Sequence, residues 1–161
     1  MAHILILDGY PWVRELYREE LVDDGHRVEA TGQIEPVEVL VRDFKPDLVL
    51  LDLYINGRDR WDVLKNLKQS YSNLPILIVT GYDGYRQDPR SILADGFVTK
   101  SGNCDGLKRK IAQVLKNKKK ISVPGTPSAK GTKRGLSYLI KAAKPSLEIP
   151  GASADHRPFP S

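Results

Sequence analysis

Cysteine, histidine and long apolar runs are scarce in this sequence, and each absence narrows the possible functions. The single cysteine, Cys104, excludes an internal disulfide. The three histidines lie far apart in the chain, which excludes a zinc motif of the usual spacing. No apolar run reaches the roughly 18 residues that a membrane span requires. The first residues, MAHILILDGYP, lack a basic lead and carry an acid, unlike a signal peptide. We therefore expect a cytoplasmic protein.

The net charge of +5 is unevenly divided along the chain. Residues 1–115 hold 15 basic and 18 acidic side chains, a net charge of −3. Residues 116–161 hold 10 basic and 2 acidic side chains, a net charge of +8. The basic character thus belongs to the C-terminal segment and not to the body of the protein.

Short apolar runs alternate with helical patterns through the first 115 residues. We predict strands at residues 3–7, 27–31, 48–51, 76–79 and 96–99, the second of them at an edge. Apolar side chains recur at helical spacing within residues 12–21, 37–44, 61–67 and 107–115, whereas 88–93 predicts a short helix at best. Such alternation predicts an α/β, doubly wound five-stranded parallel sheet with helices on both faces.

Polar side chains follow four of these predicted strands. Asp8, Asp52, Thr80 and Lys100 each stand where a strand ends, and the carboxyl edge of a parallel sheet is where ligands bind. Singly, each residue has an ordinary explanation: a turn, a cap or a surface charge. Together they indicate a phosphoryl-transfer site.

A carboxylate can accept a phosphoryl group and hold it as an acyl phosphate when a cation neutralises the charge. Asp8, Asp52 and the backbone carbonyl of Tyr54 could supply the oxygen ligands that Mg²⁺ prefers. Lys100 would pair with a phosphoryl oxygen, and the Thr80 hydroxyl would donate a hydrogen bond to another. Asp52, after the central apolar run LVLL, is the predicted phosphoacceptor.

The stretches ILILDGYP, PDLVLLDLYINGRDRWDVL, LPILIVTGYD and ADGFVTKS closely resemble the receiver domain of two-component response regulators. The resemblance implies a flavodoxin-like fold with strand order 2-1-3-4-5. It implies that a histidine kinase or phosphotransfer protein phosphorylates Asp52. It also implies that Thr80 is the switch hydroxyl, Lys100 the phosphoryl-binding lysine and Phe97 the switch aromatic residue. Ordinary core packing is the alternative interpretation of Phe97.

Two residues depart from the pattern of that family. Gly9 stands where receivers usually carry a second acid that binds the metal, so we expect a lower Mg²⁺ affinity. Ser101 stands where the family usually has a proline after a cis bond. Because a cis bond without proline costs about 2.5–4 kcal/mol, we predict either a trans Lys100–Ser101 bond or visible strain. The segment between Thr80 and Lys100 is also short, which puts the usual fourth helix in doubt.

The sequence predicts a receiver domain at residues 1–117 and a basic tail rich in Pro, Gly and Ser at 118–161. The composition of this tail is typical of disorder, and the tail is too poor in apolar residues for a DNA-binding domain. Only residues 134–144 show a short amphipathic pattern. A solubilising role is the simplest interpretation, and non-specific contact with nucleic acid or another acidic partner is the alternative.

Two functional hypotheses follow. In the first, the chain is a stand-alone receiver in a phosphorelay that catalyses only transfer onto its own Asp52 and then binds a downstream protein partner. In the second, the loss of an acid at Gly9 leaves a degenerate receiver that binds proteins independently of phosphorylation. Neither hypothesis involves a metabolic reaction or a membrane.

Overall fold

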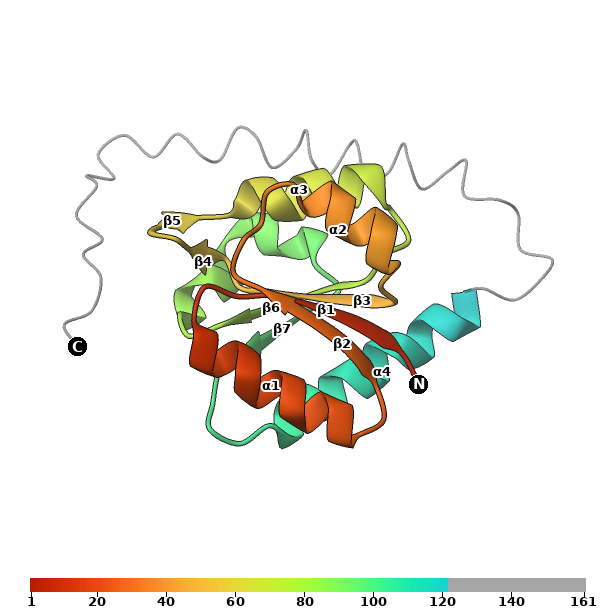
Figure 1. Ribbon diagram of the computed structural model, residues 1–161. Helices are drawn as coiled ribbons and strands as arrows, with labels where there is room; N and C mark the ends of the chain where they lie inside the picture. The colour runs from red at the N-terminus through yellow and green to blue at the C-terminus, as the bar shows by residue number, and fades with distance from the viewer. Residues whose placement is uncertain (122–161) are drawn as a thin grey trace, which may run out of the picture.

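The computed structural model describes residues 1–121, which form a parallel five-stranded sheet between two layers of helices (Figure 1). The sheet strands lie in the order β2-β1-β3-β6-β7, and each neighbouring pair is parallel. When these five strands are numbered without β4 and β5, which form a separate sheet, their order is the predicted 2-1-3-4-5. The predicted flavodoxin-like architecture is therefore confirmed. The strands are β1 (His3–Leu7), β2 (Arg27–Thr31), β3 (Leu48–Leu51), β6 (Ile76–Thr80) and β7 (Gly96–Thr99).

Burial along the strands follows their place in the sheet. All residues of the central strand β3 and of its neighbour β6 are buried, because helices cover both faces there. The edge strand β2 pairs only with β1, and its residues are partly or fully exposed, as predicted. The continuous apolar runs in the sequence therefore mark the centre of the sheet.

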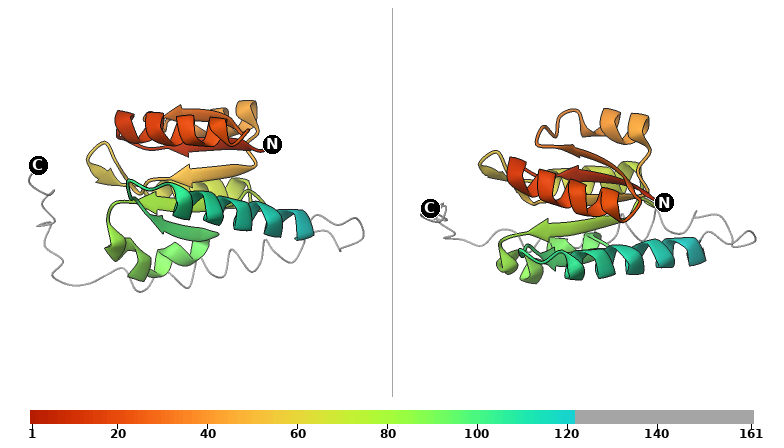
Figure 2. Two further views of the ribbon diagram at one scale, coloured as in Figure 1. Left: turned by 90° about the horizontal axis from the view of Figure 1, so that it is seen from below. Right: turned by 60° about the horizontal axis from the view of Figure 1, so that its bottom comes forward.

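Two pairs of helices cover the two faces of the sheet (Figures 1 and 2). Helices α1 (Pro11–Asp23) and α4 (Asp105–Ile121) lie on one face, where Val13, Leu21 and Ile111 join a buried cluster with residues of β1, β3 and β6. Helices α2 (Val37–Phe44) and α3 (Trp61–Ser70) lie on the other face, where Leu64 and Leu67 join a second cluster.

Helix α1 shows how the sequence pattern produces this packing. Pro11 occupies the first helical turn, where its missing N–H needs no partner. Val13, Tyr17 and Leu21 are spaced four residues apart, so they lie on one face of the helix, and all three are buried. Gly25, with a φ of 84°, turns the chain away from the helix toward β2.

The structure contains an antiparallel hairpin that the sequence patterns did not predict. It joins β4 (Tyr54–Ile55) to β5 (Arg58–Asp59) directly after the central strand. Its turn residues Asn56 and Gly57 both have positive φ, 55° and 79°, the conformation that tight hairpins need. The hydroxyl of Tyr85 donates a hydrogen bond to Asp59, which ties this hairpin to the segment after β6.

The segment between Thr80 and Lys100 is short, as the sequence predicts. It holds two single-turn 3₁₀ helices, η1 (Asp83–Gln87) and η2 (Pro89–Leu93), in place of a longer helix. Within residues 1–121 the one cis peptide bond is Glu35–Pro36, so the Lys100–Ser101 bond is trans. Helix α4 continues past residue 117, the predicted domain boundary. The tail predicted to be disordered begins at residue 118, and this prediction is wrong for residues 118–121, which belong to α4. From residue 122 onward the tail lies outside the described residues, as does the pattern at 134–144.

None of the helices in the described part of the chain is both long enough and apolar enough to cross a membrane.

Candidate functional site

Two buried acids stand at the carboxyl edge of the sheet, where β1 and β3 end side by side. The backbone N–H of Asp8 donates to Thr31 O at 3.1 Å, and that of Asp52 donates to Leu7 O at 2.9 Å. These bonds continue the sheet pattern to the acids themselves, so both side chains start from a rigid backbone. Asp8 is 2% and Asp52 3% exposed, although both are charged side chains. Buried acids of this kind require a cation or several hydrogen-bond donors.

Lys100 supplies that cation. Its backbone N–H donates to Thr80 O at 2.8 Å, which fixes the residue at the end of β7 beside β6. Its Nζ lies 2.6 Å from Asp8 Oδ2 and 2.8 Å from Asp52 Oδ2. One ammonium group therefore bridges both acids, and the structure brings together three of the four strand-end residues that the sequence singled out.

Backbone donors hold the remaining carboxylate oxygens. The N–H of Tyr10 donates to Asp8 Oδ1 at 2.8 Å, and the N–H of Tyr54 donates to Asp52 Oδ1 at 3.1 Å. Each acid therefore accepts a hydrogen bond from the residue two positions later, so the local loops fix the carboxylate orientations. Each acid keeps one oxygen directed at the shared ammonium group.

The charge at this edge is unbalanced. Two carboxylates face one ammonium, which leaves a net negative charge in a largely buried place. Burial raises the pKa of the Asp52 carboxyl, and the neighbouring charge of Asp8 adds to that rise. The attraction of Lys100 opposes the rise without cancelling it. Asp52 is therefore an acid whose charged form gains from any additional cation.

Thr80 lies at the same edge, as the last residue of the neighbouring strand β6. It is 1% exposed, and its Oγ1 accepts a hydrogen bond from the N–H of Tyr82 at 3.3 Å. Asp8, Asp52, Thr80 and Lys100 thus stand at the carboxyl ends of four adjacent strands, β1, β3, β6 and β7. This arrangement confirms the prediction that the strand ends meet at one edge.

Phe97 lies within β7, opposite Ile78 of β6, and not at the strand end. Its ring is partly buried and packs against the core on the side of α2 and α3. The guanidinium of Arg86 lies 4.4 Å from the ring centroid, and Arg86 also forms an ion pair with Asp83 at 3.4 Å. The ring is therefore held between the core and the segment that follows Thr80.

Gly9 leaves room for a side chain beside the two acids. A Cβ atom placed on it would lie 3.5 Å from the Ile55 side chain and 3.7 Å from the N of Asn56, which are ordinary contacts. Among residues 1–121, no three His, Cys, Asp or Glu side chains form a group that could hold a metal ion. Asp8 and Asp52 present carboxylate oxygens at this edge, the type of ligand that Mg²⁺ prefers.

Two residues of the site were not predicted. The ring centroid of Tyr10 lies 5.1 Å from Lys100 Nζ, within range of a cation–π interaction. Arg14 Nη1 donates to the backbone carbonyl of Asp8 at 2.6 Å. No sequence pattern marks either residue, because both contacts depend on how the loop between β1 and α1 runs. The Asn56-Gly57 pair, by contrast, is a known hairpin signal and indicates the loop that carries Tyr54.

The fold and this edge define a class of protein: a doubly wound parallel α/β domain with a buried acid pair bridged by a lysine. The family of the response regulator receiver domain matches residues 4–112. The chain therefore belongs to the response regulator receiver domain family of two-component signalling.

Curated relatives and solved structures agree with this assignment. PhoP, a virulence transcriptional regulatory protein of Salmonella choleraesuis (strain SC-B67), is 28% identical over 103 residues, which cover 62% of this chain and 46% of PhoP. Sporulation initiation phosphotransferase F of Bacillus subtilis (strain 168) is 32% identical over 80 residues, which cover 49% of this chain and 64% of the relative. The chain thus spans about half the length of PhoP.

The solved structures include the response regulator TrrA from Thermotoga maritima in complex with Mg²⁺-BeF. It is 34% identical, has a TM-score of 0.64, and the match covers 71% of this chain and 99% of TrrA. TrrA has also been solved in complex with the histidine kinase ThkA, where the TM-score is 0.61 over the same share of the two chains.

Proposed function

We propose that this receiver accepts a phosphoryl group on Asp52 from a histidine kinase or a phosphotransfer protein. The observation that carries the proposal is the Lys100 ammonium, which lies 2.8 Å from the Asp52 carboxylate and 2.6 Å from that of Asp8. A buried carboxylate beside a fixed cation is the arrangement that acyl phosphate formation requires.

In the proposed step, a carboxylate oxygen of Asp52 attacks the phosphorus of a phosphohistidine. A P–O bond forms as the P–N bond breaks, and the imidazole leaves with the electron pair and takes up a proton. Lys100 then pairs with a phosphoryl oxygen, so its ammonium keeps an anionic partner at Asp52 after phosphorylation. The reaction modifies the receiver itself and is not turnover of a metabolite.

Mg²⁺ is the proposed cofactor, and it would supply charge neutralisation between the carboxylate and the phosphoryl oxygens. Asp8, Asp52 and the backbone carbonyl of Tyr54 would hold it. Gly9 contributes no carboxylate, so we expect a lower affinity than a site with a second acid at this position would have. The response regulator TrrA has been solved in complex with Mg²⁺-BeF, which supports Mg²⁺ as the cofactor proposed here.

Thr80 and Phe97 would form the switch. The Thr80 hydroxyl lies at the same edge and would donate to a phosphoryl oxygen on Asp52. Its movement would change the neighbouring segment, where Arg86 packs on the Phe97 ring at 4.4 Å. The surface around β6 and β7 would then change its affinity for a downstream protein. In this proposal the output of the receiver domain is binding of a downstream protein.

The kinase partner is inferred from the relatives. TrrA binds the histidine kinase ThkA in a solved complex, and a phosphotransferase of Bacillus subtilis matches this chain. The basic segment of residues 116–161 adds a proposed non-specific contact with acidic partners, since its net charge is +8.

A degenerate, phosphorylation-independent binding module is the second candidate function. Gly9 favours it, because it removes an acid next to Asp8. The two candidates differ in one observable property: only the first needs a reactive Asp52.

The test is the intact mass of the full chain after incubation with Mg²⁺ and either acetyl phosphate or phosphoramidate. We expect a gain of one phosphoryl group in the unmodified chain and in Asp43→Ala, which removes an exposed acid on α2. The Asp52→Ala variant should gain none. The same gain in Asp52→Ala would contradict the assigned acceptor, and no gain with either donor would favour the binding module.

A further inference from the structure

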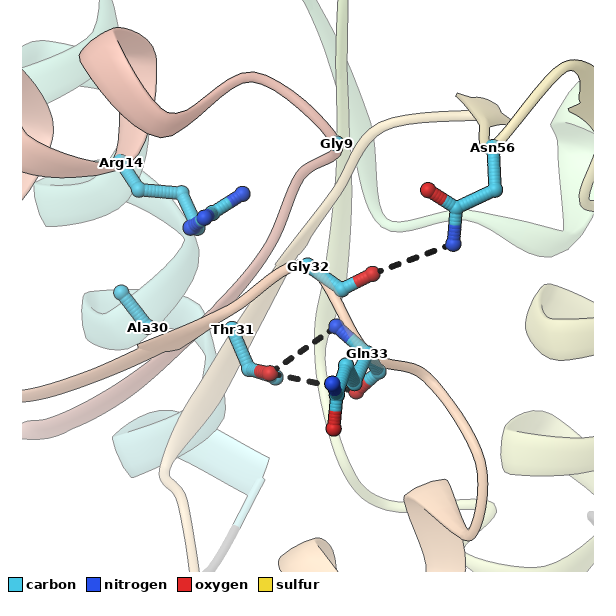
Figure 3. Close-up of a pocket in the computed structure, with 7 residues that line it drawn as sticks. All are labelled: Gly9, Arg14, Ala30, Thr31, Gly32, Gln33 and Asn56. Atoms are coloured by element: carbon cyan, nitrogen blue, oxygen red, sulfur yellow. Dashed lines mark hydrogen bonds between the residues drawn. The ribbon is translucent and has the colours of Figure 1, made fainter.

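A pocket of about 520 Å³ opens beside the acid pair, between the ends of β1 and β2 and the hairpin turn (Figure 3). Its walls include Arg14 from α1, Thr31 at the end of β2, Gln33 after that strand, and Asn56 from the turn. This volume lies within the range of pockets that bind small molecules. None of the residues lining it is acidic, although Asp8 and Asp52 are nearby.

Arg14 is the charged group of this pocket. Its Nη1 donates to the backbone carbonyl of Asp8 at 2.6 Å, which fixes the guanidinium in the wall. Within residues 1–121 Arg14 forms no salt bridge, and this hydrogen bond is the one that its side chain makes there. A fixed guanidinium with several free donors suits a phosphate group, which it can bind through two hydrogen bonds at once.

The absence of a side chain at Gly32 leaves room for the Arg14 guanidinium. A Cβ atom on Gly32 would lie 2.6 Å from Arg14 Nη1 and 3.2 Å from the carbonyl oxygen of Asp8. Only glycine at position 32 therefore leaves the guanidinium its observed position. Gly9 also lines the pocket and contributes no carboxylate to its wall.

Neutral polar groups complete the lining. The Asn56 side-chain amide donates to Gly32 O at 3.4 Å, a long bond that a better acceptor could replace (Figure 3). Figure 3 shows the side chains of Arg14 and Asn56 approaching the space around Gly9 and Gly32 from opposite sides. The hydroxyl of Thr31 is engaged with the backbone of Gln33. A ligand would thus meet a cation and an amide donor with no competing negative charge in the walls.

We propose that this pocket binds a phosphate group, either free or carried on a small molecule. The site is distinct from Asp52, and its ligand would be bound reversibly without transfer of any group. The proposal goes beyond phosphorylation of the receiver and does not depend on it.

The test is a titration of the full chain with inorganic phosphate at constant ionic strength, followed by amide NMR. We expect saturable shifts of the Gly9 and Gly32 amides and of the Asn56 side chain, with a dissociation constant on the order of 1 mM. Arg14→Gln should weaken binding about fivefold or more, whereas Arg18→Gln, an exposed arginine one turn further along the same helix, should change it less than about twofold.

A second variant separates position from charge. Gly32→Ala keeps the charge of Arg14 but displaces the guanidinium, so it should weaken phosphate binding as Arg14→Gln does. Dispersed NMR spectra of each variant verify its fold. A parallel titration with glycerol phosphate distinguishes the source: tighter binding indicates a carried phosphate, and equal binding indicates the free ion.

Shifts confined to residues 116–161 would overturn the proposal, because they would show attraction to the basic segment alone. Equal losses in Arg14→Gln and Arg18→Gln would overturn it as well, since any positive charge on α1 would then suffice. Inorganic phosphate transfers nothing to Asp52, so these outcomes stay separate from those of the mass measurement.

Discussion

A lysine meets aspartate at both edges of the sheet, with Lys68 buried and Lys100 partly buried, but the two edges differ in charge balance. At the carboxyl edge, Lys100 faces both Asp8 and Asp52. At the amino edge, Lys68 Nζ lies 2.8 Å from Asp95 Oδ2 and 3.0 Å from Leu74 O. The first group keeps one negative charge in excess, whereas the second pairs one charge with one.

The amino-edge group includes a backbone hydrogen bond as well. Asp95 Oδ2 accepts from the N–H of Ile76 at 2.8 Å as well as from Lys68. The group therefore ties the end of α3 to the starts of β6 and β7. A balanced ion pair of this kind holds elements together, whereas an unbalanced buried acid pair can gain from a further cation. The difference in charge balance therefore fits a structural role for the amino-edge group and the proposed reactive role for Asp52.

The largest expected effect comes from Lys100→Met. Removing the ammonium leaves two buried carboxylates facing each other without a cation. We expect the free energy of unfolding at neutral pH to fall by about 3 kcal/mol. The loss should shrink in acid, because protonation of one carboxylate removes the repulsion. Urea denaturation at neutral and acidic pH measures both effects, and an equal loss at the two pH values would contradict the charge argument.

Lys68→Met is the matched change at the amino edge. We expect a smaller loss of about 2 kcal/mol, because Asp95 is 39% exposed and water can solvate its carboxylate once the lysine is gone. Phosphoryl incorporation on Asp52 should stay unchanged, since the carboxyl edge keeps all its groups. Urea denaturation and intact mass are the two measurements. A loss of phosphorylation here would show that the edges are coupled and would weaken the distinction between them.

Much of the fold could be predicted from the sequence, because fully buried parallel strands require continuous apolar runs. Four of the five predicted strands have the observed bounds. The strand β6 is one residue longer than predicted, since the prediction ended at the last apolar residue and the polar Thr80 still belongs to the strand. The hairpin at Tyr54–Ile55 and Arg58–Asp59 was missed, since strands of two residues leave no periodic pattern. Its Asn56-Gly57 turn was the available signal.

The site could be predicted only in part. Parallel strands bring their carboxyl ends to one edge, so the meeting of Asp8, Asp52 and Lys100 followed from topology. The contributions of Tyr10 and Arg14 could not be predicted in this way. Tyr10 donates through its backbone and Arg14 binds a backbone carbonyl, so both depend on the path of a loop and not on a side-chain pattern.

Gly9→Asp would add a third acid to the carboxyl edge, which already holds two carboxylates and one ammonium. The added Cβ meets only ordinary contacts, so the fold should tolerate it. If the proposed metal site is right, Mg²⁺ affinity should rise about tenfold, which corresponds to about 1.4 kcal/mol. Calorimetric titration with Mg²⁺ measures the change. Gly9→Asn, similar in size but uncharged, is the control, and an equal gain in both variants would contradict a direct carboxylate contribution.

Asp52→Asn has the smallest expected effect, and its sign is the sharpest test of the comparison. Burial raises the pKa of Asp52 in the folded state above its unfolded value. Between these two values the folded protein binds more protons, so its stability falls as pH rises through that window. Asparagine removes this cost, and Lys100 keeps Asp8 as a partner at 2.6 Å.

We therefore expect Asp52→Asn to raise the free energy of unfolding at neutral pH by roughly 1 kcal/mol, with the gain vanishing in acid where Asp52 is protonated in both states. Asp95→Asn at the balanced edge should do the opposite, because it removes the sole charged partner that the structure shows for Lys68 within residues 1–121. Urea denaturation across pH measures both. If Asp52→Asn is instead less stable than the parent at neutral pH, the attraction of Lys100 outweighs burial, and both edges are structural ion pairs.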